Sequence, residues 1–347
     1  MSPKAFGGGS PLKRQPLPST TKHQWSVLLQ TLLIAGFVER SRWTREEAVF
    51  HGGTSLKLGW GSPRWSEDLD FLVKKDHLQE AERHIHSAVA FARAHLARID
   101  AALQLEVSGK TTGRMARYAV SMTKPGLLGK AMVKAEFWGV EDSYLERYPS
   151  APRLPEPPQE LAQAGYFVRV SSMLPMATLN AVMCDKLVAV ANRRYFKARD
   201  IFDMYWIQQE RSFVRPTPQE MARDVLFHAS AYDAEMDPEQ AQAPKLEFTS
   251  DQALALSTAN HLRAWVDSIG TPEYLTKAQT ELKTFLVDSM GGVHLWDSYW
   301  QGQVSTMIHD AGRMALECAA GLEDLVRERQ NDGEGTRPAP PRDVPRG

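Results

Sequence analysis

Apolar residues recur at helical spacing near the start of the chain and throughout its second half. Between Trp25 and Phe37 they appear every three or four positions, which predicts a helix over 22–39. The same spacing predicts a long helix over 76–104. Six further helices are expected from Ala177 onward, over 177–192, 199–210, 217–231, 250–267, 273–289 and 293–329.

Shorter apolar runs between glycine-containing turns predict strands in the first half of the chain. We expect the turns at Gly109–Gly113 and Lys124–Gly129 and a short helix over 54–59. The proline-rich segment over 146–160 is either an irregular linker or an ordered excursion. The expected strands are Leu69–Val73, Leu103–Val107, Arg117–Met122, Met132–Phe137 and Tyr166–Val170.

This order of elements is typical of the α+β class, in which strands and helices are segregated along the chain. We expect a mobile N-terminal segment over 1–20 and an α/β domain with a small mixed sheet over 21–175. A helical C-terminal domain should follow over 176–330, and a disordered tail over 331–347.

The composition gives no global field for nucleic acid or membranes, because the 347 residues carry a formal net charge of −1. Any basic site must therefore be local. The two cysteines, Cys184 and Cys318, lie in helical apolar patterns and predict buried thiols in a reducing cytosol. The apolar run 27–38 is too short to span a bilayer, and no signal peptide precedes it. We expect a soluble cytoplasmic protein without a membrane partner.

An Asp-x-Asp pair, Asp68 and Asp70, stands at the head of the first predicted strand. Side chains two apart on a strand share a face and lie about 6–7 Å apart at the backbone, so the pair can share divalent cations. Glu136, on a later predicted strand, is the candidate for a third carboxylate, which a two-metal phosphoryl-transfer site needs. The alternatives are an acid pair that caps a loop and a solvent-facing glutamate.

A Gly-Gly-Thr-Ser turn precedes the Asp pair and opens the short predicted helix. Gly52 and Gly53 allow a phosphate to approach the backbone closely, and Thr54 and Ser55 supply hydroxyls. The N-terminus of a helix also attracts anions. The turn is neither a Walker A loop nor a dinucleotide fingerprint. The alternative is an ordinary helix N-cap.

The most basic stretch of the chain runs from Lys186 to Arg199, with five cations and no acid. It suits a triphosphate or an RNA backbone. Asp200 follows in the expected first turn of a helix, where a carboxylate favours the helix dipole. The alternative is a solvated cationic helix end that Asp200 caps.

These blocks together resemble the AbiEii/AbiGii toxin family, which are nucleotidyltransferase-like proteins of type IV toxin–antitoxin and abortive-infection systems. The resemblance covers roughly residues 25–210. Its most specific part is Arg64-Trp65-Ser66-Glu67-Asp68-Leu69-Asp70, in which Trp65 replaces the usual phenylalanine. The other parts are Gly52-Gly53-Thr54-Ser55-Leu56, Lys186, and Arg199-Asp200-Ile201-Phe202-Asp203-Met204-Tyr205.

The resemblance implies a DNA polymerase β-like nucleotidyltransferase core with a helical C-terminal domain. It implies that Asp68 and Asp70 bind Mg²⁺ or Mn²⁺, and that Lys186 contacts the triphosphate or the leaving pyrophosphate. Asp200 would be a further essential acid. Strand order rather than a motif adds Glu136 to the metal site. Gly53 and Ser55 would hold the triphosphate, and the other candidates for nucleotide contacts are Gly52, Thr54, Arg64 and Arg199.

The function implied is transfer of NMP from an NTP to an acceptor, with the 3′ end of RNA or tRNA as the expected acceptor. The resemblance also implies a winged-helix antitoxin encoded beside the toxin. Two alternatives remain. One is a non-catalytic nucleotide-binding interaction module that keeps the fold, and the other is a nucleotidyltransferase that acts on a protein or a small molecule.

Overall fold

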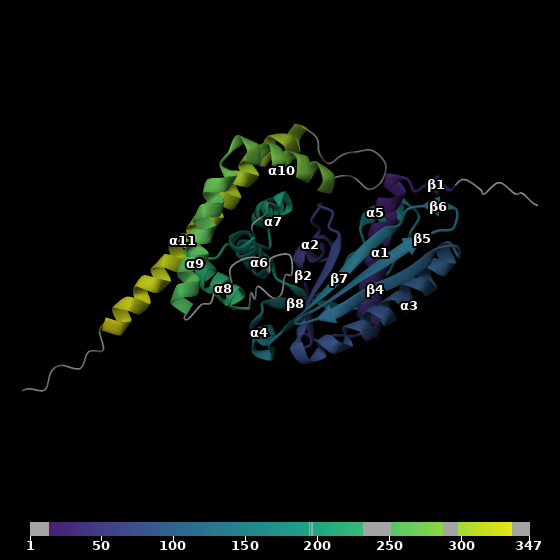
Figure 1. Ribbon diagram of the computed structural model, residues 1–347, viewed down its shortest axis with the longest axis horizontal. Helices are drawn as coiled ribbons and strands as arrows, with labels where there is room; N and C mark the ends of the chain where they lie inside the picture. The colour runs from purple at the N-terminus through teal and green to yellow at the C-terminus, as the bar shows by residue number, and fades with distance from the viewer. Residues whose placement is uncertain (1–13, 194, 196, 232–250, 287–297, 335–347) are drawn as a thin grey trace, which may run out of the picture. The chain divides into compact units, whose positions relative to one another are not determined.

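The computed structural model describes residues 14–193, 195, 197–231, 251–286 and 298–334. The chain divides into two compact units, and the main run of the first unit ends at Ala177 (Figure 1). The boundary predicted between 175 and 176 falls inside the last strand, β9 (Leu174–Ala177). The first unit contains a mixed sheet and the second is helical. The predicted fold class, α+β with a helical C-terminal part, is confirmed.

A seven-stranded sheet organises the first unit, in the order β4-β5-β7-β3-β2-β9-β8. β3 pairs in parallel with β7, and β2 pairs in parallel with β9, whereas the other neighbouring strands are antiparallel. A separate parallel pair joins β1 (Gln15–Pro16) and β6 (Leu127–Leu128). The other strands are β2 (Ala48–His51), β3 (Asp68–Lys74), β4 (Gln104–Thr112), β5 (Met115–Thr123), β7 (Ala131–Val140) and β8 (Ser150–Arg153).

Alternation along the strands gives the sheet one apolar and one polar face. On β3, Leu69 and Phe71 lie in the core while Asp68 and Asp70 point to the other face. The helices α1 (Ser19–Arg40) and α3 (Ala81–Ile99) pack together against the apolar face, and their buried residues belong to the same core (Figure 1). The polar face is therefore the one that carries the candidate site.

Shorter helices connect the strands of the first unit. The one that matters for the site is α2 (Gly52–Trp60), which begins directly after β2 and ends at Gly61. The others are the 3-10 helix η1 (Lys75–Glu80), α4 (Asp142–Arg147) and α5 (Gln159–Gln163).

The described part of the second unit consists of helices. Thr178 caps the first of them by accepting a hydrogen bond from the backbone N–H of Ala181 at 3.2 Å, and Thr217 with Glu220 forms a capping box on α8. The helices are α6 (Leu179–Asn192), α7 (Ala198–Gln209), α8 (Pro218–Ser230), α9 (Asp251–Ile269), α10 (Pro272–Phe285) and α11 (Ser298–Glu334). Cys184 and Cys318 are free and buried, as predicted.

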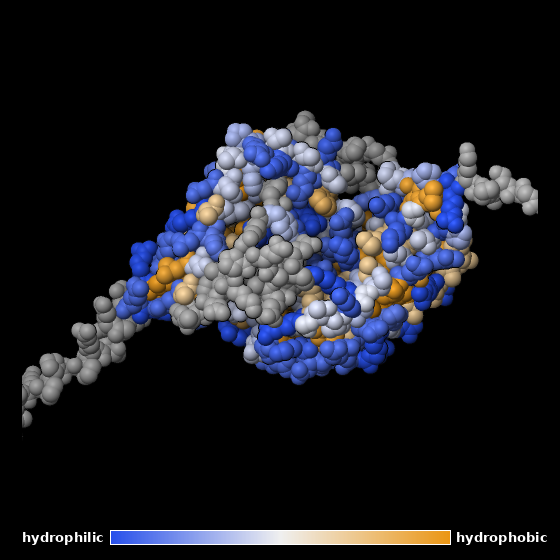
Figure 2. Space-filling view, viewed as in Figure 1, coloured by the Kyte–Doolittle hydropathy of each residue, from blue (hydrophilic) through white to orange (hydrophobic). Residues whose placement is uncertain are grey.

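Hydrophilic residues make up most of the visible surface, and apolar residues form small separate patches (Figure 2). Within the described ranges, no helix combines the length and hydropathy needed to cross a bilayer.

Several predicted elements were wrong in extent or type. The predicted helix over 76–104 is split into η1 and α3. The proline-rich segment contains β8, which agrees with the second of its two alternatives, an ordered excursion. Tyr166–Val170 is not a strand, although Tyr166 and Val168 pack against the core and Phe167 is exposed. Its alternation is real, but no neighbouring strand pairs with it in the described sheet.

Both predicted terminal segments were partly wrong, and so was one turn. Residues 14–20 include β1 and the start of α1, and α11 continues to Glu334, whereas residues 1–13 and 335–347 lie outside the described residues. Gly109, expected in a turn, lies inside β4, where an added Cβ would collide with the backbone of β5. The turn between β4 and β5 lies at Gly113 and Arg114 instead.

Candidate active site

Three carboxylates lie on the polar face of the sheet where β3 pairs with β7. Asp70 is directly opposite Glu136 in the parallel register. Asp68 is two residues earlier on β3, so its side chain points to the same face. Neighbouring strands are about 4.8 Å apart, so Asp70 and Glu136 start from adjacent positions. The register thus places all three predicted carboxylates on one patch of the sheet.

The charges of this patch act on Glu136. Burial raises the pKa of Glu136, and the carboxylates of Asp70 and Asp68 raise it further, whereas Arg117 and Lys134 lower it. Arg117 lies opposite Glu136 on β5 and places its Nε 3.3 Å from Oε1 of Glu136. The carboxylates therefore repel one another, and a bound cation would relieve this repulsion.

The residues present fit a divalent cation. Oδ1 of Asp68 is buried and has no hydrogen-bond partner in the described part of the chain. Carboxylate oxygens are the ligands that Mg²⁺ and Mn²⁺ prefer. The described residues contain no group of three or more His, Cys, Asp or Glu side chains gathered closely enough to hold a metal by themselves. That is compatible with Mg²⁺, which usually takes one or two carboxylates and completes its shell with substrate phosphates and water.

The glycine turn forms the junction of β2 and α2, next to this patch. His51, the last residue of β2, lies opposite Asp70 on β3. Gly52 has φ +76°, and an added Cβ would collide with the carboxylate of Asp70. The N-cap residue of α2, His51, makes no side-chain cap hydrogen bond, and the first turn of the helix contains no acid. The backbone N–H groups of that turn are therefore oriented to bind an anion beside the carboxylates.

The two hydroxyls of the turn bond to backbone oxygens. Thr54 donates to the carbonyl of Asp68, and Ser55 donates to the carbonyl of Gly52 at 2.8 Å. Both residues are fully buried. Thr54 thus links α2 to β3, the strand that carries the Asp pair. Because both hydroxyls already donate to the protein, the backbone N–H groups of the turn are the more direct donors for a phosphate.

Arg64 is buried beneath the same turn. An added Cβ on Gly53 would collide with its guanidinium, and Nη1 of Arg64 donates to the carbonyl of Trp65 at 2.8 Å. Nearby, Gln30 of α1 donates to the carbonyl of Ser66 at 2.6 Å. Arg64 therefore supports the turn from the protein side and adds a positive charge behind it.

A second cluster of predicted residues lies in the helical unit, between α6 and α7. Nζ of Lys186 lies 2.7 Å from Oδ1 of Asp200 and 2.9 Å from Oδ2 of Asp203. Arg193 forms an ion pair with the other oxygen of Asp200. Asp203 is fully buried, and only 3% of the Asp200 side chain is exposed. The cluster is a buried network of two cations and two carboxylates.

The cations keep Asp200 ionised. Burial raises the pKa of Asp200, but Arg193 and Lys186 outweigh this effect and hold the pKa well below its ordinary range. Burial, together with the charges of Arg193 and Arg199, lowers the pKa of Lys197 to about 8. Positive charge is therefore concentrated around the start of α7, which fits the basic stretch seen in the sequence.

Helix α10 holds the beginning of α7. Oε2 of Glu281 accepts a hydrogen bond from the backbone N–H of Ala198 at 3.0 Å, which satisfies one of the N–H groups that a first turn leaves unpaired. The next residue, Arg199, has its guanidinium carbon 5.0 Å from the centre of the Phe285 ring. Arg199, a predicted nucleotide contact, is thus half-buried against the end of α10.

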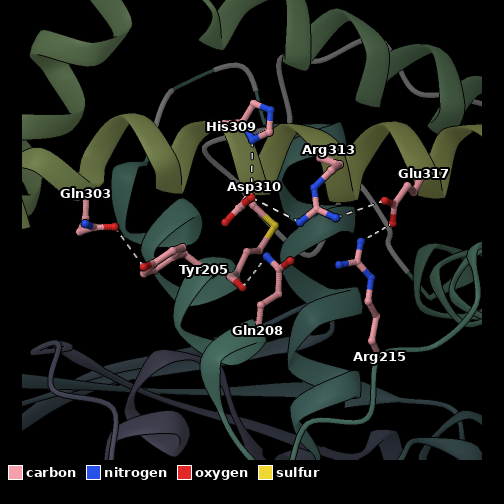
Figure 3. Close-up of polar contacts among 9 residues, drawn as sticks. Tyr205, Gln208, Arg215, Gln303, His309, Asp310, Arg313 and Glu317 are labelled. Carbon is pink, nitrogen blue, oxygen red and sulfur yellow. Dashed lines mark hydrogen bonds and ion pairs between the residues drawn. The ribbon is translucent and has the colours of Figure 1, made fainter.

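Polar contacts join α11 to α7 and to the connection that follows α7 (Figure 3). The hydroxyl of Tyr205 donates to Oε1 of Gln303 at 3.3 Å. Further along α11, Arg313 lies 3.5 Å from Glu317, and Glu317 also pairs with Arg215 from the connection that follows α7. The Tyr205 contact therefore joins α7, which carries both acids of the cluster, to α11, and the Arg215 pair joins the following connection to α11.

Sequence reasoning assigned no role to three residues of these clusters. Asp203 shares a helix face with Asp200 because it lies three residues later, and this spacing was a usable signal. Arg193 was visible only as one of several cations. Arg117 lies in a strand whose neighbours the sequence does not identify, so its pairing with Glu136 could not be predicted.

Comparison with known proteins places the chain in a family. The sequence model described as "Nucleotidyl transferase AbiEii toxin, Type IV TA system" matches residues 43–300, whereas no curated protein matches the chain. Among solved structures, it is similar to JHP933 from Helicobacter pylori, with 15% identity, 92% of this chain and 100% of that chain covered, and a TM-score of 0.43. It is also similar to MenT4, a nucleotidyltransferase toxin of Mycobacterium tuberculosis H37Rv, with 15% identity, coverage of 84% and 94%, and a TM-score of 0.44. The family match spans the glycine turn, the carboxylate patch and the Lys186 cluster. The chain therefore belongs to the AbiEii nucleotidyltransferase toxin family of type IV toxin–antitoxin systems, as its sequence predicted.

Proposed function

We propose that this protein transfers a nucleoside monophosphate from an NTP to the 3′ hydroxyl of an RNA acceptor, with tRNA as the preferred class, and that the reaction depends on Mg²⁺ or Mn²⁺. The observation that carries the proposal is the register that sets Asp70 opposite Glu136, with Asp68 on the same face and the N-terminus of α2, whose N-cap side chain makes no cap hydrogen bond, beside them. Carboxylates and an anion site are the two parts that such a transfer needs.

The ion would be held by carboxylate oxygens of Asp68, Asp70 and Glu136. The chemistry that it supplies when bound is neutralisation of negative charge on the phosphate oxygens and on the departing pyrophosphate. The first turn of α2 would bind the triphosphate through its backbone N–H groups. Gly52 and Gly53 permit the close approach, because a side chain at either position would meet Asp70 or Arg64.

In the transfer, the oxygen of the acceptor hydroxyl forms a bond to the α-phosphorus of the NTP. The bond from that phosphorus to the oxygen bridging the α- and β-phosphates breaks, and pyrophosphate leaves with the bonding electrons. The hydroxyl proton passes to a carboxylate oxygen of Glu136, which lies beside Asp70 in the strand register. Positioning and electrostatics supply most of the rate enhancement in reactions of this kind.

Lys186 would contact the triphosphate or the leaving pyrophosphate, and Asp200 would act with it. The ion pairs with Asp200 and Asp203 keep the Lys186 ammonium charged and oriented. A buried ionic network is a poor source of stability compared with apolar packing, so its presence supports a functional role. The family implies an antitoxin partner, and we propose a winged-helix protein encoded beside this chain.

Label transfer tests the proposal directly. Purified protein is incubated with total RNA, each α-labelled NTP in turn, and Mg²⁺, and label is then sought in RNA and in protein. We expect label in RNA, and we expect Asp68→Ala to abolish it without unfolding the protein. Glu67→Ala is the matched control, because Glu67 is an exposed acid next to Asp68 that lies outside the carboxylate patch.

The outcomes separate the alternatives. Label in protein would indicate a protein nucleotidyltransferase. NTP binding without transfer to RNA, protein or a small molecule would indicate a non-catalytic module. Undiminished transfer by the Asp68→Ala variant would remove Asp68 from the reaction.

A further inference from the structure

The polar face of the sheet continues beyond the carboxylates onto β7, β5 and β4. The opposite face of these strands is closed, since Ala135, Tyr118 and Leu105 lie in the core. On the polar face, by contrast, Lys134 of β7 and Lys110 of β4 are exposed. The strands next to the candidate site thus offer an accessible surface on one side only.

The strand registers arrange this surface in two rows that start at the Asp pair. Each row takes one residue from each of the strands β3, β7, β5 and β4, in that order. The first row is Asp68, Lys134, Ala119 and Ser108, and the second is Asp70, Glu136, Arg117 and Lys110.

Beyond the three carboxylates, this surface carries three cations, Lys134, Arg117 and Lys110. Lys134 and Lys110 make no ion pair with any described residue. Arg117 lies between them in the sheet and pairs with Glu136 at the edge of the carboxylate patch. The one acid that β4 adds to this face is Glu106, four residues from Lys110. Beyond the carboxylates, the surface is complementary to a polyanion.

Sheet order decides which substrate lies here. The glycine turn, which would bind the triphosphate, follows β2 on one side of β3. The strands β7, β5 and β4 lie on the other side of β3. In an in-line displacement the attacking hydroxyl approaches the α-phosphorus from the side opposite the leaving pyrophosphate. The acceptor must therefore reach the Asp pair from the side of β7.

We propose that the 3′-terminal nucleotides of a single-stranded RNA acceptor lie across the polar face of β7, β5 and β4, and that their phosphates contact Lys134 and Lys110. This inference rests on the proposed transfer to RNA. From β3 to β4 the surface spans three strand spacings, or about 14 Å, which accommodates a few nucleotides. Ala119 and Ser108 have small side chains, so the sugar–phosphate chain can approach the sheet between the two lysines.

Such contacts would supply affinity and register rather than sequence preference, because phosphates carry no base information. The surface would therefore accept any single-stranded 3′ end. Nucleotide preference would have to come from the NTP pocket or from other parts of the acceptor.

Direct binding tests the inference separately from catalysis. The full-length protein carries Asp68→Asn to prevent turnover, and the probe is a short single-stranded RNA with a 5′-fluorescein, followed by anisotropy over a range of salt concentrations. We expect Lys134→Glu with Lys110→Glu to weaken binding about tenfold or more. The slope of log K against log salt is negative, and its magnitude should decrease by about 0.7 for each lost phosphate contact. Binding of a fluorescent NTP analogue should not change.

Lys22→Glu is the matched control, because Lys22 is an exposed lysine of α1, on the closed side of the sheet. If the double charge reversal does not fold, the pair Lys134→Gln and Lys110→Gln replaces it. Unchanged affinity and salt slope in the double variant would overturn the inference. So would a parent protein that binds no RNA. RNA binding through this face with label going only to protein would instead overturn the proposed function.

Discussion

The ammonium nitrogen of Lys186 lies 2.7 Å from Oδ1 of Asp200, inside a helical unit whose surrounding core is apolar. The pair was predicted from the sequence as two independent site residues. In the structure they are partners, and Asp203 and Arg193 complete the network. Any measurement on one member of the network therefore also reports on the others.

Replacement of Lys186 by Met should destabilise the protein by about 3–5 kcal/mol, because it removes one partner from a buried ionic network and leaves the carboxylates with less positive charge. Urea denaturation measures this change. Lys277→Met is the control, since Lys277 and Glu273 form an exposed pair on α10 that should contribute nothing measurable. A Lys186→Met protein as stable as the parent would show that Lys186 serves only the substrate.

Asp200→Asn should have an effect that depends on pH. The pKa of Asp200 in the folded state lies below its ordinary value of 3.8, so the ionised carboxylate contributes stability that is fully present above that value. The contribution is lost as the pH falls through the folded-state pKa. Parent and variant should therefore differ by about 3 kcal/mol near neutrality and converge on acidification. Urea midpoints from about pH 7 to about pH 1 test this, because the contribution of such a carboxylate is lost over the acid part of that range, and a constant gap over the whole range would contradict it.

The sequence was sufficient for the geometry that a local pattern encodes. Asp68 and Asp70 alternate with Leu69 and Phe71, so their shared face follows from the period of a strand. The glycine turn and its helix were placed correctly for the same reason, since both are local. The third carboxylate, Glu136, was found from strand order, and the register confirms that it lies beside Asp70.

The sequence was insufficient wherever a partner distant in the chain decides the outcome. Tyr166–Val170 has the alternation of a strand, but a strand also needs a hydrogen-bonded neighbour, which alternation does not provide. Arg64 was expected to contact the nucleotide, and only the fold shows that it is buried beneath Gly53. Whether a side chain is buried in this way depends on contacts between segments that are far apart in the sequence. A short-range sequence pattern does not predict such contacts.

Arg117→Met should shift the pH dependence of transfer. Arg117 lowers the pKa of Glu136, so its removal raises that pKa, and a higher pH is then needed to ionise the carboxylate. We expect the acidic limb of the kcat profile to move to higher pH, and the shift should be modest because Arg117 is partly exposed. The kcat profile at saturating RNA is used because it excludes effects on acceptor binding.

Arg114→Met is the control for that shift. Arg114 has nearly the same exposure as Arg117, 37% against 38%, but it pairs with Glu141 rather than with Glu136. Its profile should coincide with that of the parent. Equal shifts in both variants would point to a general loss of positive charge, and no shift in either would show that Glu136 does not limit the rate at acidic pH.

Gly52→Ala should impair catalysis more than it impairs folding. Gly52 and Gly61 both have left-handed backbones, with φ +76° and φ +81°, so alanine at either position should cost about 1–2 kcal/mol of stability. They differ in surroundings, since an added Cβ on Gly52 would collide with the Asp70 carboxylate, whereas none of the described atoms lies within 4 Å of one on Gly61. Only Gly52→Ala must therefore displace Asp70.

We expect Gly52→Ala to lower kcat/KM for label transfer by at least about tenfold, the equivalent of roughly 1.4 kcal/mol, while Gly61→Ala keeps the parent value. Thermal melting and single-turnover transfer on the two variants separate the effects, and equal activity in both would show that the close contact between turn and carboxylate is not needed for the reaction.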